Sequence, residues 1–175
     1  MLLCLIKRES DIFMNIPVGE RVAENIDIKK VDVRKVISDL QSKNFSGYIA
    51  VTTKMNYGFE DSTLFFKQGS VMGCSHAFLA FDKIIYGEEG IRLFFNSFAS
   101  QFGCFDVFRL TNEQMELIIT FNDKILIKSA NMQKIFDNYI KEYKESLVEK
   151  YIDKSELSKD KYALLKEIGL GNIGL

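Results

Sequence analysis

The sequence of 175 residues holds few of the side chains that bind metals or form disulfides. It has three cysteines, none of them paired in a CxxC spacing, and a single histidine. Structural zinc sites usually take their ligands from closely spaced pairs, and a disulfide framework needs an even set of cysteines. The cysteine pattern therefore argues against both and is typical of a protein from a reducing cytoplasm.

Long apolar runs and an excess of charge are also missing. No apolar run approaches the roughly 18 residues that span a bilayer. The 23 basic and 24 acidic residues nearly cancel, and most of the basic residues are lysine rather than arginine, the usual residue of phosphate forks. A net charge near zero creates no overall field to attract nucleic acid or an anionic membrane. The composition therefore predicts no membrane partner and argues against nucleic acid.

The chain is rich in apolar and aromatic side chains. Hydrophobic residues make up 47% of it, with 15 Phe and 7 Tyr, which excludes disorder for most of its length. Stretches rich in β-branched and aromatic residues predict a meander of three short antiparallel strands over residues 48–53, 62–67 and 70–76. Neither face of this meander is very polar. We therefore expect helices to cover one face, and another part of the chain or a partner to cover the other.

Two details of the meander can be predicted from local rules. Strict alternation places Val71 and Gly73 on one face of the third strand, and Cys74 on the other. The connection at Gln68 and Gly69 predicts a three-residue bulged hairpin with Gly69 left-handed, because Gln68 resists the positive φ of a type I′ turn.

Helical spacing surrounds the meander. Asp32 is expected to cap a helix whose apolar stripe includes Val33 and Leu40, and Thr111 with Gln114 forms a capping box for a later helix that ends near residue 128. Between them, a turn of helix from Asp82 is expected, then a kink or a new start at glycines 87 and 90, and a strand over residues 104–110. The fold class is therefore α+β: helix, three-stranded antiparallel meander, helix, strand, helix, and a helical C-terminal appendage.

The chain divides into four parts. Residues 1–13 are expected to be an N-terminal extension, and residues 14–128 the α+β domain. Residues 129–153 repeat apolar side chains at intervals of three and four, with charges opposite, which predicts an amphipathic helix. Residues 154–175 are expected to form a short helical tail.

Four stretches of the main domain resemble a known family: residues 44–51, 64–73, 86–90 and 103–108. Their spacing and glycines are similar to those of an archaeal domain family of unknown function, which looks related to the PATAN domains found beside bacterial response regulators. The resemblance covers roughly residues 15–128. It implies an α+β domain, an archaeal cytoplasmic setting and an interaction module, as PATAN domains are usually regarded. It supplies no catalytic positions.

One group of residues offers reactive chemistry. Cys74 and His76 lie two apart on a predicted strand and so share a face, and Cys104 lies on the fourth predicted strand. If these strands were neighbours, the three side chains would supply three zinc ligands or a Cys–His nucleophile pair. The alternative is two packed thiols and a hydrogen-bonded histidine, and the burial typical of cysteine favours it.

The predicted C-terminal helix supplies the candidate interface. Its apolar stripe includes Tyr139, Tyr143, Leu147 and Tyr151, and tyrosine is enriched in protein interfaces. We expect this helix to pack against the domain or a second copy, and its remaining apolar edge to bind a partner.

The sequence as a whole predicts a non-catalytic protein-interaction module, an adaptor or regulator, with no catalytic residue and no cofactor. Its partner is expected to be another protein or a second copy of the chain, in the cytoplasm. The first alternative is a metal- or thiol-dependent enzyme centred on Cys74, His76 and Cys104. The second is a weak nucleic-acid-binding protein that uses the lysines between residues 154 and 166.

Overall fold

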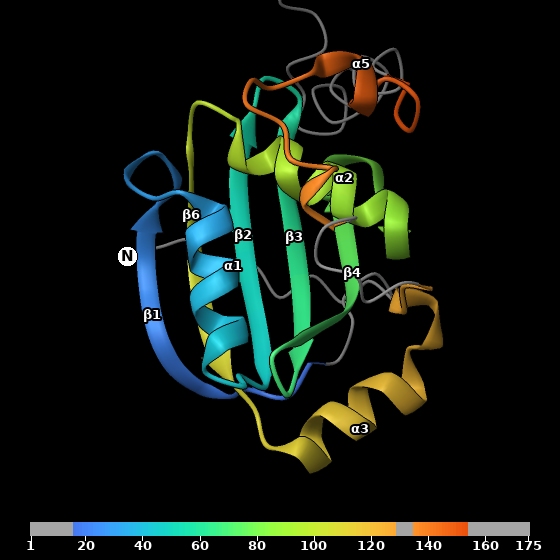
Figure 1. Cartoon of the computed structure of the whole chain (residues 1–175). Helices are drawn as coiled ribbons and strands as arrows, with labels where there is room; N and C mark the ends of the chain where they lie inside the picture. Colours follow the sequence, from blue (N-terminus) through green and yellow to red (C-terminus); the bar gives the residue numbers. More distant parts are fainter. Residues whose placement is uncertain (1–15, 129–134, 154–175) are drawn as a thin grey trace, which may run out of the picture.

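The computed structural model describes residues 16–128 and 135–153, and the described residues form one six-stranded antiparallel sheet with helices around it (Figure 1). The strand order is β1-β6-β2-β3-β4-β5. The strands are β1 (Glu20–Asp27), β2 (Gly47–Met55), β3 (Gly58–Lys67), β4 (Ser70–Phe78), β5 (Lys83–Tyr86) and β6 (Gly103–Arg109). The α+β class is confirmed. The predicted meander is present as β2, β3 and β4, but it is the centre of a larger sheet.

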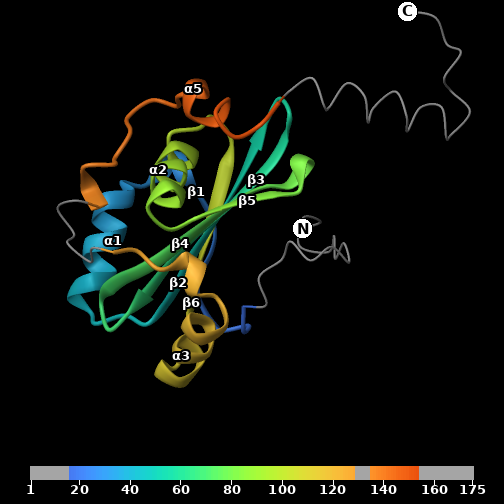
Figure 2. The ribbon, with the colours of Figure 1, turned by 90° about the vertical axis from the view of Figure 1, so that its right-hand side faces the viewer.

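The helices lie on both sides of this sheet. They are α1 (Val33–Ser42), α2 (Gly87–Phe98), α3 (Asn112–Phe121) and α5 (Glu145–Val148), with 3₁₀ turns η1 (Ile28–Lys30), η2 (Leu79–Phe81) and η3 (Asp123–Ile125). Figure 2 shows α1 and α2 on one side of the sheet and α3 at its lower end. Among the described helices, none is both long and apolar enough to cross a membrane.

Two apolar layers therefore cover the sheet, as the sequence predicts. The larger lies between the sheet and the helices α1 and α2, and includes Ile37, Ile49, Leu64, Phe66, Phe94, Phe95 and Val107. On the opposite face, α3 contributes Met115 and Ile118, which pack on Tyr48 and Phe65. The second layer comes from the chain itself, so this part of the other face needs no partner to cover it.

The predicted alternation in β4 is wrong beyond Met72. Phe65 pairs with Gly73 and Phe66 with Val71, so Met72 is an extra residue on β4, a β-bulge. The bulge reverses the facing of every later side chain, and Cys74 joins Val71 in the layer under α1 and α2. Gly73 faces the other way, where a methyl group would lie 2.6 Å from the carbonyl oxygen of Ile125.

The β3–β4 turn also differs from the prediction. Gln68 (φ 49°) and Gly69 (φ 77°) both have positive φ, and Lys67 pairs directly with Ser70, so the turn is a two-residue one. The amide of Gln68 donates to Ser46 Oγ at 2.9 Å. The amide of Gly69 donates to the carbonyl oxygen of Phe45, in the loop between α1 and β2, at 2.8 Å. These bonds hold Gln68 in a conformation that its side chain alone would disfavour.

The predicted caps are confirmed, but one predicted turn of helix is wrong. Asp32 Oδ1 accepts the amide of Arg34 at 2.9 Å at the start of α1, and Thr111 and Gln114 form the capping box of α3. The residues after Asp82 form the edge strand β5, not a helix. The new start expected at the glycines is confirmed, since α2 begins at Gly87 and continues to Phe98.

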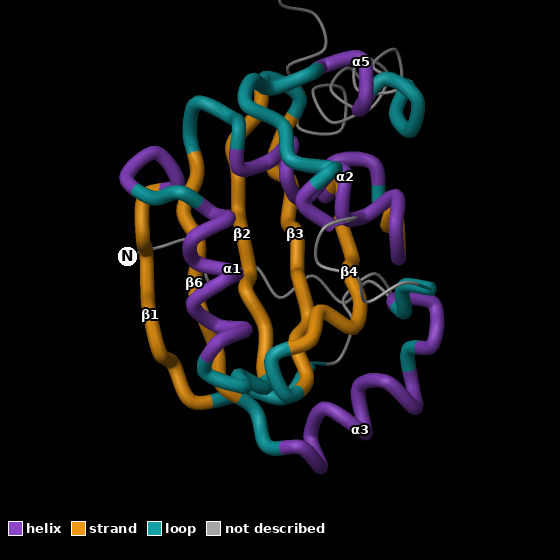
Figure 3. Tube along the Cα trace, in the orientation of Figure 1, coloured by secondary structure: helices purple, strands orange, loops and turns teal. Residues whose placement is uncertain are grey.

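The predicted amphipathic helix of residues 129–153 is not continuous over its described part, because residues 135–136 and α5 are helical but residues 137–144 are not. We call residues 135–153 the strap, which runs over α2 (Figure 3). The carboxamide of Asn96 explains this, because it accepts the amide of Lys144 at 2.7 Å and donates to its carbonyl at 3.2 Å. Ile135 and Val148 are buried, which confirms that the segment packs against the domain. The extension of residues 1–13 and the tail of residues 154–175 lie outside the described residues.

Candidate functional site

Polar side chains are buried together between the sheet and α2. Thr53 on β2 lies opposite Glu60 on β3, and Ser62 on β3 lies opposite His76 on β4. The alternation of the strands turns all four toward α2, which adds Ser97. Each is at most 1% exposed. We call these five residues, together with Tyr57 and Tyr143, the buried polar network.

Glu60 is the centre of the buried polar network. The Tyr57 hydroxyl donates to its Oε1, while Ser97 Oγ donates to Oε2 at 3.3 Å and Thr53 Oγ1 at 3.4 Å. The Tyr143 oxygen lies 2.8 Å from the Tyr57 oxygen. Because the Tyr57 proton is used on Glu60, Tyr143 must be the donor to Tyr57. The strap is thereby connected to a carboxyl group inside the domain.

Within the described part of the chain, His76 has one hydrogen-bond partner. Its Nδ1 lies 2.6 Å from Ser62 Oγ, while its Nε2 lies 3.9 Å from Glu60 Oε2 and has no hydrogen-bond partner among the described residues. Burial lowers the pKa of His76 to about 3, so the imidazole is neutral near pH 7. The contact between His76 and Glu60 is within ion-pair distance, but it is not an ion pair because the imidazole is neutral. The sequence of contacts from Ser62 through His76 to Glu60 resembles that of a catalytic nucleophile, base and acid. All three side chains, however, are buried away from solvent.

Burial also decides the state of Glu60. It raises the pKa of the Glu60 carboxyl, and the hydroxyls of Tyr57, Ser97 and Thr53 oppose the rise without cancelling it. A buried charge without a cation is costly, whereas three donated hydrogen bonds stabilise the carboxylate. The protonation state of Glu60 therefore depends both on the packing that buries its carboxyl group and on the hydroxyls that donate to it.

The structure brings together two of the three residues predicted as reactive. Cys74 and His76 share the face of β4 under α2, whereas Cys104 lies on β6 and faces the opposite side of the sheet. Strands β4 and β6 are separated by two others, about 14 Å apart at roughly 4.8 Å per strand. Burial raises the pKa of the Cys74 thiol, which disfavours the nucleophilic thiolate. Within residues 16–128 and 135–153, no three His, Cys, Asp or Glu side chains come close enough to hold a metal ion.

Two of the predicted interface residues are packed against α1 and α2. The ring of Tyr139 meets Phe95 edge-on, with centroids 6.0 Å apart, and the Arg34 guanidinium lies 4.4 Å from its centre. Tyr143 belongs to the buried polar network through the contact of its hydroxyl with that of Tyr57.

The other two lie where the strap passes the end of β4. Tyr151 stacks on Phe78 at 6.3 Å and donates its hydroxyl proton to Glu89, while Leu147 packs in the same apolar cluster. All four candidates therefore make contacts within the chain. A contact between any of them and a partner protein stays a prediction. The lysines between residues 154 and 166 lie outside the described residues.

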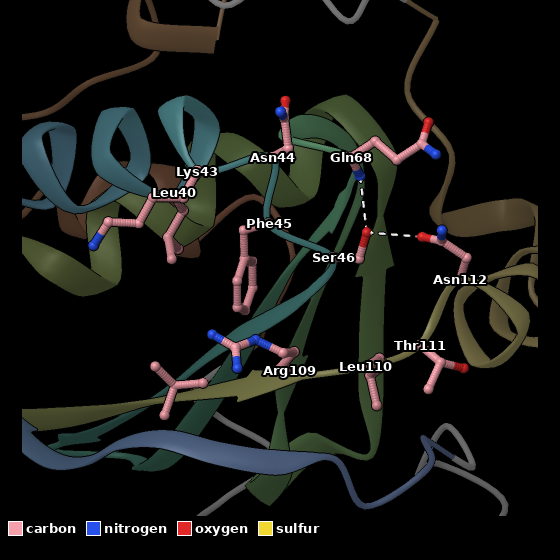
Figure 4. Close-up of a pocket in the computed structure, with 11 residues that line it drawn as sticks. Leu40, Lys43, Asn44, Phe45, Ser46, Gln68, Arg109, Leu110, Thr111 and Asn112 are labelled. Atoms are coloured by element: carbon pink, nitrogen blue, oxygen red, sulfur yellow. Dashed lines mark hydrogen bonds between the residues drawn. The ribbon is translucent and has the colours of Figure 1, made fainter.

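A pocket of about 540 Å³ lies where α1 ends and α3 begins (Figure 4). It is bounded by the loop between α1 and β2, the β3–β4 turn and the end of β6. Its lining residues are Val22, Leu40, Lys43, Asn44, Phe45, Ser46, Gln68, Arg109, Leu110, Thr111 and Asn112. No sequence motif predicts this pocket, because its residues come from segments far apart in the chain.

The outer face of α3 is the second surface that the sequence analysis missed. Leu117 is 54% exposed and Phe121 is 79% exposed, one turn apart on the same helix. Leu126, just after η3, is 38% exposed. The spacing of four residues between Leu117 and Phe121 was a signal for this surface that the sequence prediction did not use.

The comparisons with known proteins agree with part of the sequence reading. A family described as an uncharacterised protein conserved in archaea (DUF2226) matches residues 14–122. A comparison with curated proteins and one with solved structures found no match. The archaeal family expected from the sequence is confirmed, and the relation to PATAN domains stays a prediction.

Proposed function

Because the chain belongs to the family described as an uncharacterised protein conserved in archaea (DUF2226), we propose a function from its surface: a non-catalytic protein-interaction module of adaptor or regulatory type. It works by docking a second copy of itself through the outer face of α3. The resemblance to PATAN interaction modules supports this proposal.

The observation that carries it is the exposure of Leu117 and Phe121. A helix on a sheet normally buries its apolar stripe and shows polar residues to solvent. On α3 the inner stripe is buried, as Met115 is 0% exposed, while the outer stripe exposes a leucine and a phenylalanine. Apolar side chains grouped on an outer face are typical of docking surfaces.

The charges beside this stripe favour a second copy. Glu113 lies one turn before Leu117, and Lys124 follows Phe121 by three residues, both exposed. Along the chain the surface therefore has an acid, two apolar side chains and a base. If two copies of α3 pair antiparallel about a two-fold axis, Leu117 meets Phe121 and the acid of each copy meets the base of the other. In that arrangement the surface would be complementary to itself.

The contact is expected to be weak. A standard interface takes about 800 Å² from each partner, whereas one helix face with three exposed apolar side chains supplies less. We expect the dissociation constant of the dimer to lie in the upper micromolar range or above, as for a regulated contact.

Sedimentation velocity from about 10 μM to 1 mM tests the proposal through the apparent mass. The wild-type mass should rise with concentration, and Phe121→Glu should stay monomeric. Phe102→Glu is the matched control, since Phe102 is 66% exposed near the opposite end of the sheet. Glu113→Lys should weaken the dimer, and adding Lys124→Glu should restore it.

Three results would overturn this assignment. A wild type that is monomeric at every concentration would exclude a second copy as the partner of α3. Binding of a different protein to the outer face of α3 would show that this protein, and not a second copy, is the partner. Equal behaviour of the Phe121→Glu and Phe102→Glu variants would place any association elsewhere on the surface.

A further inference from the structure

We propose that the pocket between α1 and α3 is a binding site for a small organic anion with an apolar body. Its volume of about 540 Å³ falls within the roughly 300–1,000 Å³ of typical ligand sites. Apolar side chains from four elements line it, which suits an aromatic or aliphatic body: Val22, Leu40, Phe45 and Leu110. This site is separate from the outer face of α3.

The charge of the pocket selects an anion. The lining includes two cations, Lys43 and Arg109, and no aspartate or glutamate. Arg109 Nη1 is paired with Glu20 Oε2 at 3.0 Å, at the exposed edge of the sheet. Lys43 forms no ion pair with any described residue, so its charge is available to a ligand.

A hydrogen-bond chain in the pocket fixes the orientation of one donor. Ser46 Oγ accepts the amide of Gln68 at 2.9 Å and lies 3.0 Å from Asn112 Oδ1 (Figure 4). The hydroxyl has one proton, which must go to Asn112 Oδ1. The carboxamide of Asn112 is therefore oriented with its NH₂ group away from Ser46, and that group has no partner among the described residues. A donor held in place before binding loses little entropy when a ligand arrives.

Two of the four non-glycine residues with positive φ in the described part of the chain line the pocket. Asn44 and Gln68 both line the pocket and both have a φ of 49°, in the left-handed region. Such conformations cost of order 1–3 kcal/mol each and cluster at ligand sites. Here they shape the wall of the pocket from two separate loops.

A pair of dyes tests the proposal directly. 8-Anilinonaphthalene-1-sulfonate has an apolar body and an anionic sulfonate, whereas N-phenyl-1-naphthylamine has the same body without the charge. Titration of the folded protein, followed by dye fluorescence, should show one saturable site for the sulfonate dye and at least about tenfold weaker binding of the neutral dye, since hydrogen bonds to charged groups are strong.

Asn112→Asp is the decisive variant. It keeps the acceptor for Ser46 and favours the N-terminus of α3, so the fold should be retained. It replaces the donor by a negative charge, and the affinity for the sulfonate dye should fall about tenfold or more while the neutral dye is unaffected. Asn56→Asp makes the same change in the exposed β2–β3 turn and should stay within twofold of wild type. Lys43→Met should weaken the anion by up to about fivefold, and Lys54→Met should not.

Four results would overturn the site. Three are an absence of saturable fluorescence in the folded protein, equal affinity for both dyes, and an Asn112→Asp variant that binds the sulfonate dye as well as Asn56→Asp does. The fourth is a loss of dye affinity in Phe121→Glu, since that would place the dye on α3. Circular dichroism of each variant shows that a lost signal reflects the pocket and not unfolding.

Discussion

The hydroxyl oxygen of Tyr143 lies 2.8 Å from that of Tyr57, whose own proton is donated to Glu60. Two residues 86 positions apart thus share a proton chain that ends on a carboxyl group inside the domain. The strap is fixed to the rest of the domain by these hydrogen bonds, by the carboxamide of Asn96 on α2, and by apolar packing. The tyrosines of the strap therefore make contacts that stabilise the fold of this chain.

Removing the hydroxyl of Tyr143 tests that conclusion. Tyr143→Phe leaves the packing intact but takes the donor from Tyr57, so we expect a loss of about 1–2 kcal/mol in the free energy of unfolding. Urea titration followed by circular dichroism measures it. Tyr139→Phe is the matched control, because the contacts found for Tyr139 use its ring, and its loss should be within about 0.5 kcal/mol. Equal losses in the two variants would contradict the proton chain.

The lone histidine gives a second prediction that needs no substitution. Burial lowers the pKa of His76 to about 3 in the folded protein, against 6.5 for the free side chain. The imidazole C2–H resonance should therefore show no titration step between pH 8 and pH 5. A midpoint near 6.5 in the folded state would contradict the burial of the ring.

The same shift has a consequence for stability. Between the lowered folded pKa of His76 and its unfolded value of 6.5, the unfolded chain binds more protons than the folded one. Stability contributed by this group is therefore complete above pH 6.5 and is lost as the pH falls, by at most about 1.4 kcal/mol per pH unit. Urea titrations from pH 8 to pH 5 should show the free energy of unfolding of the wild type falling at the acid end relative to that of His76→Gln, which lacks the titrating group.

Local sequence rules predicted the elements whose signals are local. The caps at Asp32 and Thr111 follow from side chains that bond amides two or three residues away, and the central strands follow from dense β-branched and aromatic residues. The edge strand β1 was missed because it is mostly exposed and charged, and its bulges, together with the positive φ of Asn25, break a period of two.

The errors came from tertiary contacts. The spacing of the strap predicts a helix, yet Asn96 on α2 pairs with its backbone and holds it irregular. The pocket could not be predicted either, because Ser46 and Asn112 meet only after α1, β6 and α3 are in place. Cys74 and His76 were correctly placed on one face, whereas strand order separates Cys104 from them.

Glu60 gives a prediction with the opposite sign to that of His76. Burial raises the pKa of its carboxyl, so between the unfolded value of 4.5 and the raised folded value the folded chain binds more protons. Stability from this group is present at low pH and is lost as the pH rises through that window. Glu60→Gln cannot ionise, so its free energy of unfolding relative to wild type should increase as the pH rises above about 4.5. A difference that does not change with pH would contradict an ionisable buried Glu60.

Gln68 offers the last test, because it adopts a backbone conformation that favours glycine. With φ at 49°, its left-handed conformation costs about 1–2 kcal/mol, partly offset by the extra freedom of glycine in the unfolded chain. Gln68→Gly should therefore leave the free energy of unfolding unchanged or raise it by up to about 1 kcal/mol. Gln41→Gly, in the last turn of α1, is the control and should lose about 1 kcal/mol, since glycine is unfavourable within a helix. Equal losses in the free energy of unfolding of the two variants would contradict a strained conformation of Gln68 held by the bond from its amide to Ser46.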